Sequence, residues 1–278
     1  MERFLEYLQI NTTLARDILV RFVRDEVQRN GFERVVLGVS GGIDSALSAF
    51  IAAEALGPQN VLGIQMPHST SNPTSFADGT LVIEHLGIRH DQVDISPMVD
   101  PLMERFPDMT PVRRGNVMAR QRMIVLYDQS MAFNGLVAGT SNKTEALLGY
   151  TTLFGDSAAA FQPIGDLYKN QVRQLAQAMG VPQPIIDKAP SADLWEGQTD
   201  EGELGYTYDM ADQALYLLVD LRYTVEECVA AGFERRFIEN VWQRVRRNHY
   251  KRTVPNVAKL SGRTLGHDFL YLRSWSAG

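Results

Sequence analysis

The sequence predicts an α/β fold: a parallel sheet with helices on both faces, followed by a mostly helical C-terminal elaboration. Over the first half of the chain, short apolar runs rich in β-branched residues alternate with segments of helical periodicity, which is typical of a parallel sheet covered by helices. After Asp166 the pattern is mostly helical. The 278 residues contain no repeat, low-complexity tract or Pro/Gly/Ser-rich linker. We therefore expect a single domain over residues 1–278, a length that one α/β domain can reach.

Each expected element has a local signal. Thr12 or Thr13 can cap the first helix, Gly31 can end it, and Thr224 with Glu227 forms a capping box at a later helix. Short apolar runs predict strands over 35–39, 61–66, 92–95 and 136–138. Helical spacing predicts helices over 14–27, 46–56, 76–86, 115–132, 168–179, 209–219, 224–230 and 234–248.

Composition narrows the functional classes. Lys and Arg number 27 against 33 Asp and Glu, a net charge of −6, so no basic excess suggests a nucleic-acid partner. No apolar run approaches the roughly 18 residues of a membrane span, and we expect no secretory signal. Cys228 is the single cysteine, which excludes an internal disulfide and fits a reducing compartment. We therefore expect a cytoplasmic protein with no membrane or nucleic-acid partner.

The most informative segment lies between the first expected strand and the next helix. Its residues are Gly38, Val39, Ser40, Gly41, Gly42, Ile43, Asp44 and Ser45. Small residues here let backbone N–H groups approach a phosphate, and the helix N-terminus attracts negative charge. Asp44 could hold Mg²⁺ between phosphate oxygens. The alternative is a Gly-rich turn in which Asp44 or Ser45 is an ordinary N-cap. No Gly-Lys-Ser/Thr follows, so this is not a Walker loop.

Two later blocks contain further candidate binding residues. Arg120 and Arg122 are two residues apart on an expected helix and point to different sides of it, so one could bind an anion while the other makes an ion pair. The block 139–145 follows the fourth expected strand, at the edge where parallel sheets bind ligands. There Glu145 could supply a second carboxylate to Mg²⁺, and Lys143 could offset phosphate charge. The structural alternative makes Glu145 a residue of a helix surface and Asp156 a helix cap.

The loop resembles that of the N-type ATP pyrophosphatases, which cleave ATP between the α and β phosphates and transfer AMP to a substrate oxygen. From about residue 16 to residue 256, the chain closely resembles the NAD synthetase family. The further motifs that carry this resemblance are Gly-Asn-x-x-Ala-Arg-x-Arg-Met from Gly115, Gly-Thr-x-Asn-Lys-x-Glu from Gly139, Gly-Tyr-x-Thr-x-x-Gly-Asp from Gly149, Leu-Tyr-Lys from Leu167 and Lys-Ala-Pro-Ser-Ala-Asp-Leu from Lys188.

The resemblance implies an adenine nucleotide alpha hydrolase-like, Rossmann-like fold and the activity of a carbon–nitrogen ligase. Such an enzyme amidates deamido-NAD to NAD with ammonia, in the final step of NAD biosynthesis. It uses ATP, passes through an adenylated intermediate, and releases AMP and pyrophosphate. Cys228 lacks the neighbouring Cys/His/Glu signature of a glutaminase. We therefore expect the nitrogen source to be free ammonia or ammonia from a separate protein.

The resemblance also implies roles for individual residues. The ATP site is expected to comprise the loop from Gly38 to Ser45 together with Thr140, Lys169 and Ser191. Deamido-NAD is expected to contact Arg120, Asp156, Tyr250 and Lys251. Asp44 and Glu145 are expected to bind Mg²⁺, and Asp156 and Lys169 to serve catalysis. The family forms homodimers, for which helix 14–27 would supply part of the interface.

Three positions depart from the family pattern. Leu153 stands where the family often has a lysine that contacts deamido-NAD, Ser191 replaces a threonine, and Tyr250 adds an aromatic residue beside Lys251. Two alternative functions stay open from the sequence. One is a different adenylating enzyme with this loop, such as a GMP-synthetase-like amidase or a tRNA-thiolating enzyme. The other is a nucleotide-binding regulatory protein without turnover.

Overall fold

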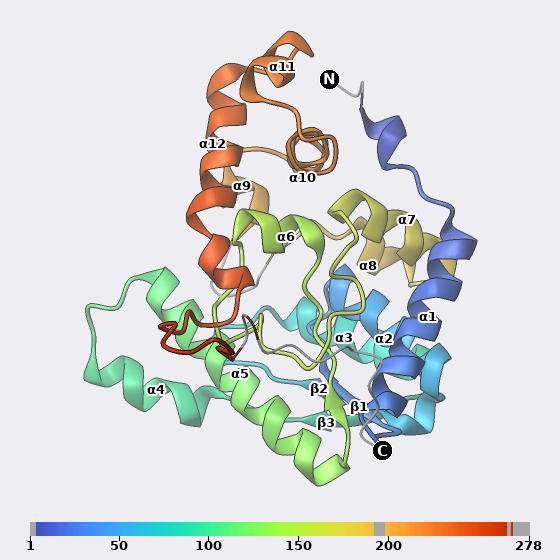
Figure 1. Cartoon of the computed structure of the whole chain (residues 1–278). Helices are drawn as coiled ribbons and strands as arrows, with labels where there is room; N and C mark the ends of the chain where they lie inside the picture. The colour runs from blue at the N-terminus through green and yellow to red at the C-terminus, as the bar shows by residue number, and fades with distance from the viewer. Residues whose placement is uncertain (1–3, 192–197, 266–267, 269–278) are drawn as a thin grey trace.

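The computed structural model describes residues 4–191, 198–265 and 268. Within these residues, four parallel strands form one sheet in the order β3-β2-β1-β4. The strands are β1 (Val35–Gly38), β2 (Val61–Gln65), β3 (Arg89–Gln92) and β4 (Leu136–Val137). The predicted α/β fold with a parallel sheet is therefore confirmed (Figure 1). The Ala-Asp-Leu end of the motif from Lys188 lies outside the described residues.

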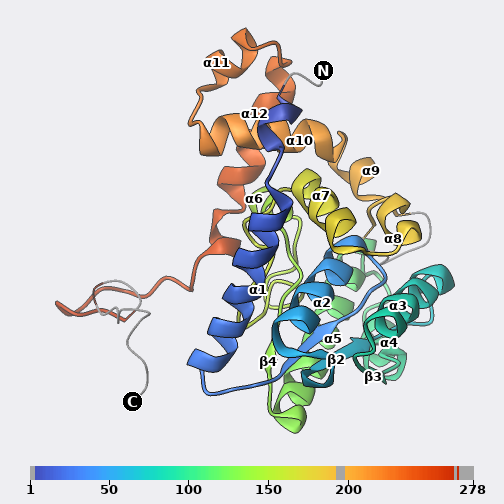
Figure 2. The same ribbon diagram turned by 90° about the vertical axis from the view of Figure 1, so that its right-hand side faces the viewer.

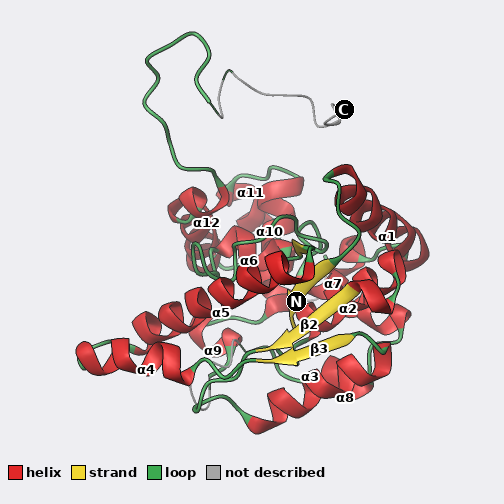
Figure 3. Ribbon diagram, turned by 90° about the horizontal axis from the view of Figure 1, so that it is seen from below, coloured by secondary structure: helices red, strands yellow, loops and turns green. Residues whose placement is uncertain are grey.

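Helices cover both faces of the sheet, as predicted (Figure 3). One face packs against α1 (Thr12–Arg29), α2 (Ile43–Leu56), α3 (Pro73–Leu86), α7 (Lys169–Met179) and α8 (Gln183–Asp187). The other face packs against α4 (Ser96–Arg105) and α5 (Pro111–Phe133). Side chains of a strand alternate between faces, so Val35 and Leu37 join the first apolar core while Val36 joins the second. No helix among the described residues is long and apolar enough to cross a membrane.

A third layer of helices lies over the carboxyl ends of the strands and has its own apolar core (Figures 1 and 2). It contains α6 (Lys143–Leu148), α9 (Asp200–Leu204), α10 (Tyr208–Leu215), α11 (Val225–Ala230) and α12 (Arg235–Arg247), with the N-terminal 3₁₀ turn Leu5–Leu8 against them. A π-helical turn, Tyr216–Asp220, continues α10, and the 3₁₀ turn η4 (His249–Arg252) follows α12. This layer is the predicted helical elaboration. Beyond η4 the chain leads away from the body of the molecule (Figure 2).

Several boundaries differ from the predicted ones for identifiable reasons. Asn11, rather than Thr12 or Thr13, caps α1, because its side chain accepts from the backbone N–H of Leu14 at 3.0 Å. The strand predicted over 92–95 is β3, three residues earlier, and its four side chains are all exposed. An edge strand pairs through its backbone and needs no apolar pattern, whereas Val93 and Ile95 pack into the core after the strand ends. The capping box of α11 is confirmed.

Candidate active site

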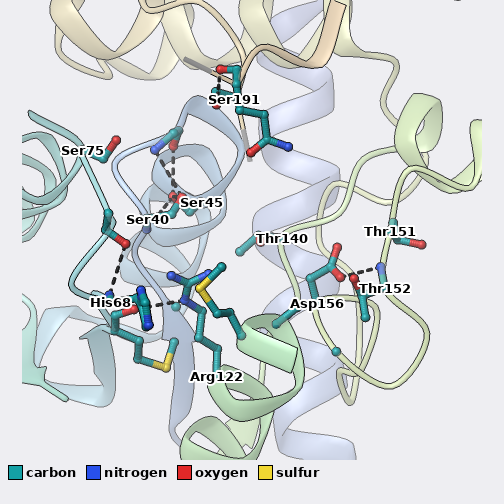
Figure 4. Close-up of a pocket in the computed structure, with 18 of the residues that line it drawn as sticks. Ser40, Ser45, His68, Ser75, Arg122, Thr140, Thr151, Thr152, Asp156 and Ser191 are labelled. Atoms are coloured by element: carbon teal, nitrogen blue, oxygen red, sulfur yellow. Dashed lines mark hydrogen bonds between the residues drawn. The ribbon is translucent and has the colours of Figure 1, made fainter. Parts of the chain in front are cut away.

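A cavity of about 1780 Å³ opens at the carboxyl ends of β1, β2 and β4, beneath the helical layer. β1 lies between β2 and β4, so the chain connections leave it in opposite directions. Such a switch point is where parallel α/β sheets bind ligands. Segments from most of the chain line the cavity, and Figure 4 shows Ser40 and Ser45 on one side of it and Asp156 with Thr152 on the other.

The loop after β1 is closed by its own serines. Ser45 Oγ accepts from the backbone N–H of Ser40 at 3.2 Å and donates to the carbonyl of Gly42 at 3.0 Å. The first N–H groups of α2 belong to Ile43, Asp44 and Ser45, and a helix leaves such groups without an intrahelical acceptor. The loop and α2 together therefore present backbone donors suited to a phosphate.

Gly41 is the one residue of the predicted loop that does not line the cavity. It has φ +78°, and a Cβ atom there would lie 2.1 Å from the carbonyl oxygen of Ser75 on α3. Only glycine tolerates both constraints. Gly41 therefore lets the loop turn tightly against α3, while every other residue of the predicted loop, Gly38–Ser45, lines the cavity.

Asp44, Glu145 and Lys169 meet at the floor of the cavity, although they are far apart in the sequence. Each lies in the first turn of its helix, α2, α6 and α7 respectively. The ammonium group of Lys169 contacts Asp44 Oδ2 and lies 3.3 Å from Glu145 Oε1, with its side chain 3% exposed. Asn142 Nδ2 donates to Asp44 Oδ1 at 2.8 Å. We call Asp44, Glu145 and Lys169 the lysine–carboxylate cluster.

Burial and charge act in opposite directions within this cluster. Burial raises the pKa of Glu145, and the neighbouring charge of Asp44 adds to the increase. Burial alone would lower the pKa of Lys169, but the negative charges of Asp44 and Glu145 outweigh it, so the pKa of Lys169 is raised. Lys169 therefore stays charged, and its ammonium group is a fixed cation between the two carboxylates, beside the phosphate loop.

Asp156 lies on the opposite side of the cavity, in the segment between α6 and α7. Asp156 Oδ1 accepts from the backbone N–H of Thr152 at 2.6 Å, and the Thr152 hydroxyl donates to Asn116 Oδ1 of α5 at 2.7 Å. Solvent in the cavity reaches the Asp156 carboxylate. The surrounding protein atoms nevertheless desolvate it enough to raise its pKa, against the opposing charge of Lys251.

Four other residues predicted for substrates are placed differently from one another. Thr140 and Ser191 line the cavity, and the Ser191 hydroxyl donates to the carbonyl of Gln198 at 2.8 Å. Lys251 also lines it, but its ammonium group donates to the carbonyls of Gly149 and Thr151, both at 2.7 Å. Tyr250 is 58% exposed and is not among the lining residues.

Of the two arginines predicted as candidates on α5, Arg122 lines the cavity and Arg120 does not. Arg122 Nε donates to the carbonyl of Met66 after β2 at 3.0 Å, whereas Arg120 is exposed and donates to the carbonyl of Leu153. The predicted difference in direction between the two arginines is therefore observed. Lys143, predicted as a phosphate partner, instead pairs with Asp220 at 2.9 Å and Asp166 at 3.2 Å, outside the cavity lining.

Several lining residues were not singled out from the sequence. Lys188 Nζ donates to Asp78 Oδ2 at 2.7 Å beside the phosphate loop, and its presence in a recognised motif was an available signal. His68 follows the carboxyl end of β2, where ligands are expected, and its ring contacts Asp100 Oδ1 at 2.9 Å. Asp200, 4% exposed, accepts from the hydroxyl of Tyr208 at 2.9 Å. No local pattern distinguished Asp200 from the neighbouring acidic residues.

The switch-point cavity, the loop of backbone donors and the lysine–carboxylate cluster are features of a nucleotide-binding α/β protein. Comparison with known proteins makes the class specific. The family model described as NAD synthase matches residues 16–255. The chain belongs to the NAD synthase family.

Individual relatives agree with this membership. The chain is 56% identical over 268 residues to a protein of Trichlorobacter lovleyi named NH(3)-dependent NAD(+) synthetase, covering 96% of this chain and 98% of that protein. Its fold is similar to that of an NMN synthetase from Francisella tularensis, with a TM-score of 0.80 and 32% identity over 91% of this chain and all of that one. It is also similar to an NH3-dependent NAD synthetase from Campylobacter jejuni, with a TM-score of 0.77 and 31% identity over 90% of this chain and all of that one.

Proposed function

We propose that the protein is a carbon–nitrogen ligase that amidates deamido-NAD to NAD with ammonia and ATP, releasing AMP and pyrophosphate. The observation that carries the proposal is the lysine–carboxylate cluster beside the phosphate loop in a chain of the NAD synthase family. A cytoplasmic location is part of the proposal, supported by the use of ATP and by the reduced, buried Cys228.

The reaction needs ATP because a carboxylate resists attack by ammonia. Its leaving group would be oxide, whereas adenylation converts that oxygen into part of AMP. The nicotinate carboxylate attacks the α-phosphorus and expels pyrophosphate, and ammonia then displaces AMP from the acyl-adenylate. The backbone donors of the loop and the charged Lys169 are suited to the negative charge that develops on the departing pyrophosphate. Thr140 and Ser191 are proposed to contact ATP from the cavity wall.

The cluster also fits Mg²⁺. Mg²⁺ binds through one or two protein carboxylates together with substrate phosphates. Asp44 and Glu145 are two carboxylates that both contact the buried ammonium group of Lys169, and the cavity lies beside them. When bound, Mg²⁺ would neutralise charge on the phosphate oxygens. In the structure, Lys169 contacts both carboxylates and orients them beside the cavity.

Asp156 and its surroundings are proposed to receive the nicotinate end of deamido-NAD. Ammonia becomes positively charged when it adds to the acyl-adenylate, so a carboxylate in the cavity can accept a proton at that step. The raised pKa of Asp156 makes it a stronger base than an ordinary aspartate. Lys251 lines the same part of the cavity, and its contacts with Gly149 and Thr151 shape the loop that carries Asp156.

We also propose that the protein is a homodimer. Arg120, Ile124, Tyr127 and Met131 recur on one face of α5, and the last three side chains are exposed although they are apolar or aromatic. Leu14 and Ile18 form a second exposed apolar pair on α1. A second copy covering the face of α5 would lie beside Arg120, where the predicted contact of that residue with deamido-NAD could form.

An assay of pyrophosphate release tests the reaction. Purified protein is given ATP, Mg²⁺ and ammonium, and the acceptor is deamido-NAD, xanthosine monophosphate or absent. We expect equal amounts of AMP, pyrophosphate and NAD with deamido-NAD only. Pyrophosphate release with xanthosine monophosphate would instead identify a GMP-synthetase-like amidase. No release with any acceptor would identify a nucleotide-binding protein without turnover. Light scattering after gel filtration measures the dimer, which Ile124→Glu is expected to dissociate.

A second acceptor belongs in the same assay, because one structural neighbour is an NMN synthetase. Amidation of nicotinate mononucleotide yields NMN by the same chemistry as amidation of deamido-NAD. Leu153 replaces a lysine expected to contact deamido-NAD, so the preference for the dinucleotide must rest on other contacts. We expect kcat/KM for deamido-NAD to exceed that for nicotinate mononucleotide, and the reverse ratio would reassign the acceptor.

A further inference from the structure

A carboxylate outside the cavity is fully buried beneath the lysine–carboxylate cluster. Asp212 on α10 has no exposed surface and lies among the apolar residues of the helical layer. It does not line the cavity. An isolated buried carboxylate costs several kcal/mol, so such a group persists in a core only where strong donors satisfy it. Burial raises the pKa of Asp212 to about 6, although the hydrogen bonds to it act in the opposite direction.

The donors to Asp212 come from the two helices that carry the cluster. The hydroxyl of Thr144 on α6 donates to Asp212 Oδ1 at 2.5 Å, and the backbone N–H of Asn170 on α7 donates to Oδ2 at 2.7 Å. The Thr144 hydroxyl also accepts from the backbone N–H of Lys169 at 3.0 Å. Asp212 thus binds the first N–H of α7 through Thr144 and the second directly.

These contacts add to the local cap of α7, in which the Gln171 side chain accepts from the backbone N–H of Tyr168 at 3.0 Å. The N-cap residue of α7 is Tyr168, whose hydroxyl donates to Asp220 in the neighbouring turn. The first N–H groups of a helix require acceptors, and a carboxylate near them is also favoured by the helix dipole. Arg173 and Asp209 are the other charged groups that act on Asp212. The carboxylate therefore fixes the start of α7 relative to α6.

Thr144 precedes Glu145 in α6, and Lys169 is the first residue of α7. We infer that Asp212, acting through Thr144, is a positioning residue that sets the distance between Glu145 and Lys169 for the ATP-consuming half of the reaction. The inference rests on the proposed function. Although Asp212 does not line the cavity, we expect its contact with Thr144 to affect the binding of ATP and not that of deamido-NAD.

The test removes the hydroxyl of Thr144 while keeping the shape of the side chain. In Thr144→Val we expect the KM for ATP to rise at least about tenfold, since outer-shell partners of such sites typically contribute 10- to 100-fold. The KM for deamido-NAD is expected to stay within about twofold of wild type. Thr144→Ser keeps the hydroxyl and is expected to restore most of the loss. Calorimetric titration with ATP should show the same order of affinities without turnover.

The control is Thr224→Val at the start of α11, whose hydroxyl accepts from the backbone N–H of Glu227 away from the cavity lining. It removes an equivalent hydroxyl and should leave the KM for ATP unchanged. If Thr144→Val does not fold, Thr144→Ala replaces it. The inference is overturned if the hydroxyl-free variant keeps wild-type ATP affinity, or if its KM values for both substrates rise equally. Failure of the proposed function is distinguishable, because wild-type protein would then release no pyrophosphate with deamido-NAD.

Discussion

The cavity has two ends, the phosphate end beside the Gly38–Ser45 loop and the acceptor end beside Asp156. At the phosphate end the backbone forms the surface of the cavity, whereas at the acceptor end side chains distant in the sequence hold a loop in shape. Gly38–Ser45 closes on itself through Ser40 and Ser45 and continues directly into α2. The segment 149–156, which carries Asp156, contains no helix or strand. Lys251, about one hundred residues further along the chain, holds two of its carbonyls.

The support at the acceptor end extends to the last turn of α6. Arg252 donates to the carbonyls of Ala146 and Leu147, and Asn248 donates to that of Leu148. We call Asn248, Lys251 and Arg252 the C-terminal clamp. We therefore expect substitutions at the phosphate end to affect ATP binding and turnover, because its backbone and charged groups are the ones proposed to contact the phosphates. Substitutions in the clamp should have smaller, graded effects on the acceptor.

Lys169→Met is expected to have the largest effect. It removes the cation between Asp44 and Glu145, so pyrophosphate release should fall about 10³-fold, the upper range for loss of an electrostatic transition-state contact. The free energy of unfolding should also fall by about 3 kcal/mol, because two buried carboxylates lose their partner. Lys143→Met is the matched control, since Lys143 pairs with Asp166 and Asp220 outside the cavity. Equal losses in both variants would remove the distinction between the two lysines.

Asp156→Asn should reduce kcat about 10²-fold if the carboxylate accepts a proton, a typical contribution of a general base. Because desolvation raises the pKa of Asp156, the carboxylate should become protonated, and kcat should fall, at a pH above the range of an ordinary aspartate. The profile is measured at a constant concentration of free ammonia, so that ammonium ionisation does not contribute. The acidic limb should disappear in Asp156→Asn. Its persistence with an unchanged rate would assign the limb to another group.

Gly41→Ala should raise the KM for ATP about tenfold and lower stability by more than the roughly 1 kcal/mol of a positive-φ glycine alone. The added methyl group would lie 2.1 Å from the Ser75 carbonyl, so the loop must move. Gly180→Ala is the matched control, with φ +82° and open space around the Cβ position. A normal KM for ATP in Gly41→Ala would show that the close approach to α3 is dispensable.

The two ends of the cavity also differ in how far the sequence predicts them. The loop was predictable because glycine spacing, the preceding strand and the following helix are all local signals. The choice between Arg120 and Arg122 was not, since helical spacing separates their directions without revealing which side of α5 faces the cavity. The contact of Lys169 with Asp44 and Glu145 joins three helices, so the resemblance to a family indicated those residues where local patterns could not.

The same reasoning explains the remaining differences. β3 has no apolar alternation because it is an exposed edge strand, so periodicity predicted the apolar residues after it. Asp200 and Asp212 are buried acidic residues. Asp200 accepts from the hydroxyls of Tyr150 and Tyr208, and Asp212 from the backbone N–H of Asn170, and only folding brings these groups together. Aspartates are usually exposed, so composition does not predict that either residue is buried. The single-domain prediction and the individual substrate contacts stay predictions.

The smallest effect is expected from the clamp, and it separates two roles for the C-terminal basic residues. Arg252→Lys keeps the charge but loses the planar fork, in which Nη1 donates to the carbonyls of Ala146 and Leu147 and Nη2 to that of Val245. We expect the KM for deamido-NAD to rise about threefold and the KM for ATP to stay unchanged, because a lost carbonyl contact is typically worth about 1 kcal/mol. Tyr250→Ala tests direct contact, since Tyr250 is exposed and makes no part of the clamp. If Tyr250→Ala raises the KM for deamido-NAD more than Arg252→Lys does, the acceptor is bound by side chains at the surface, as in a dimer interface, and the clamp is secondary.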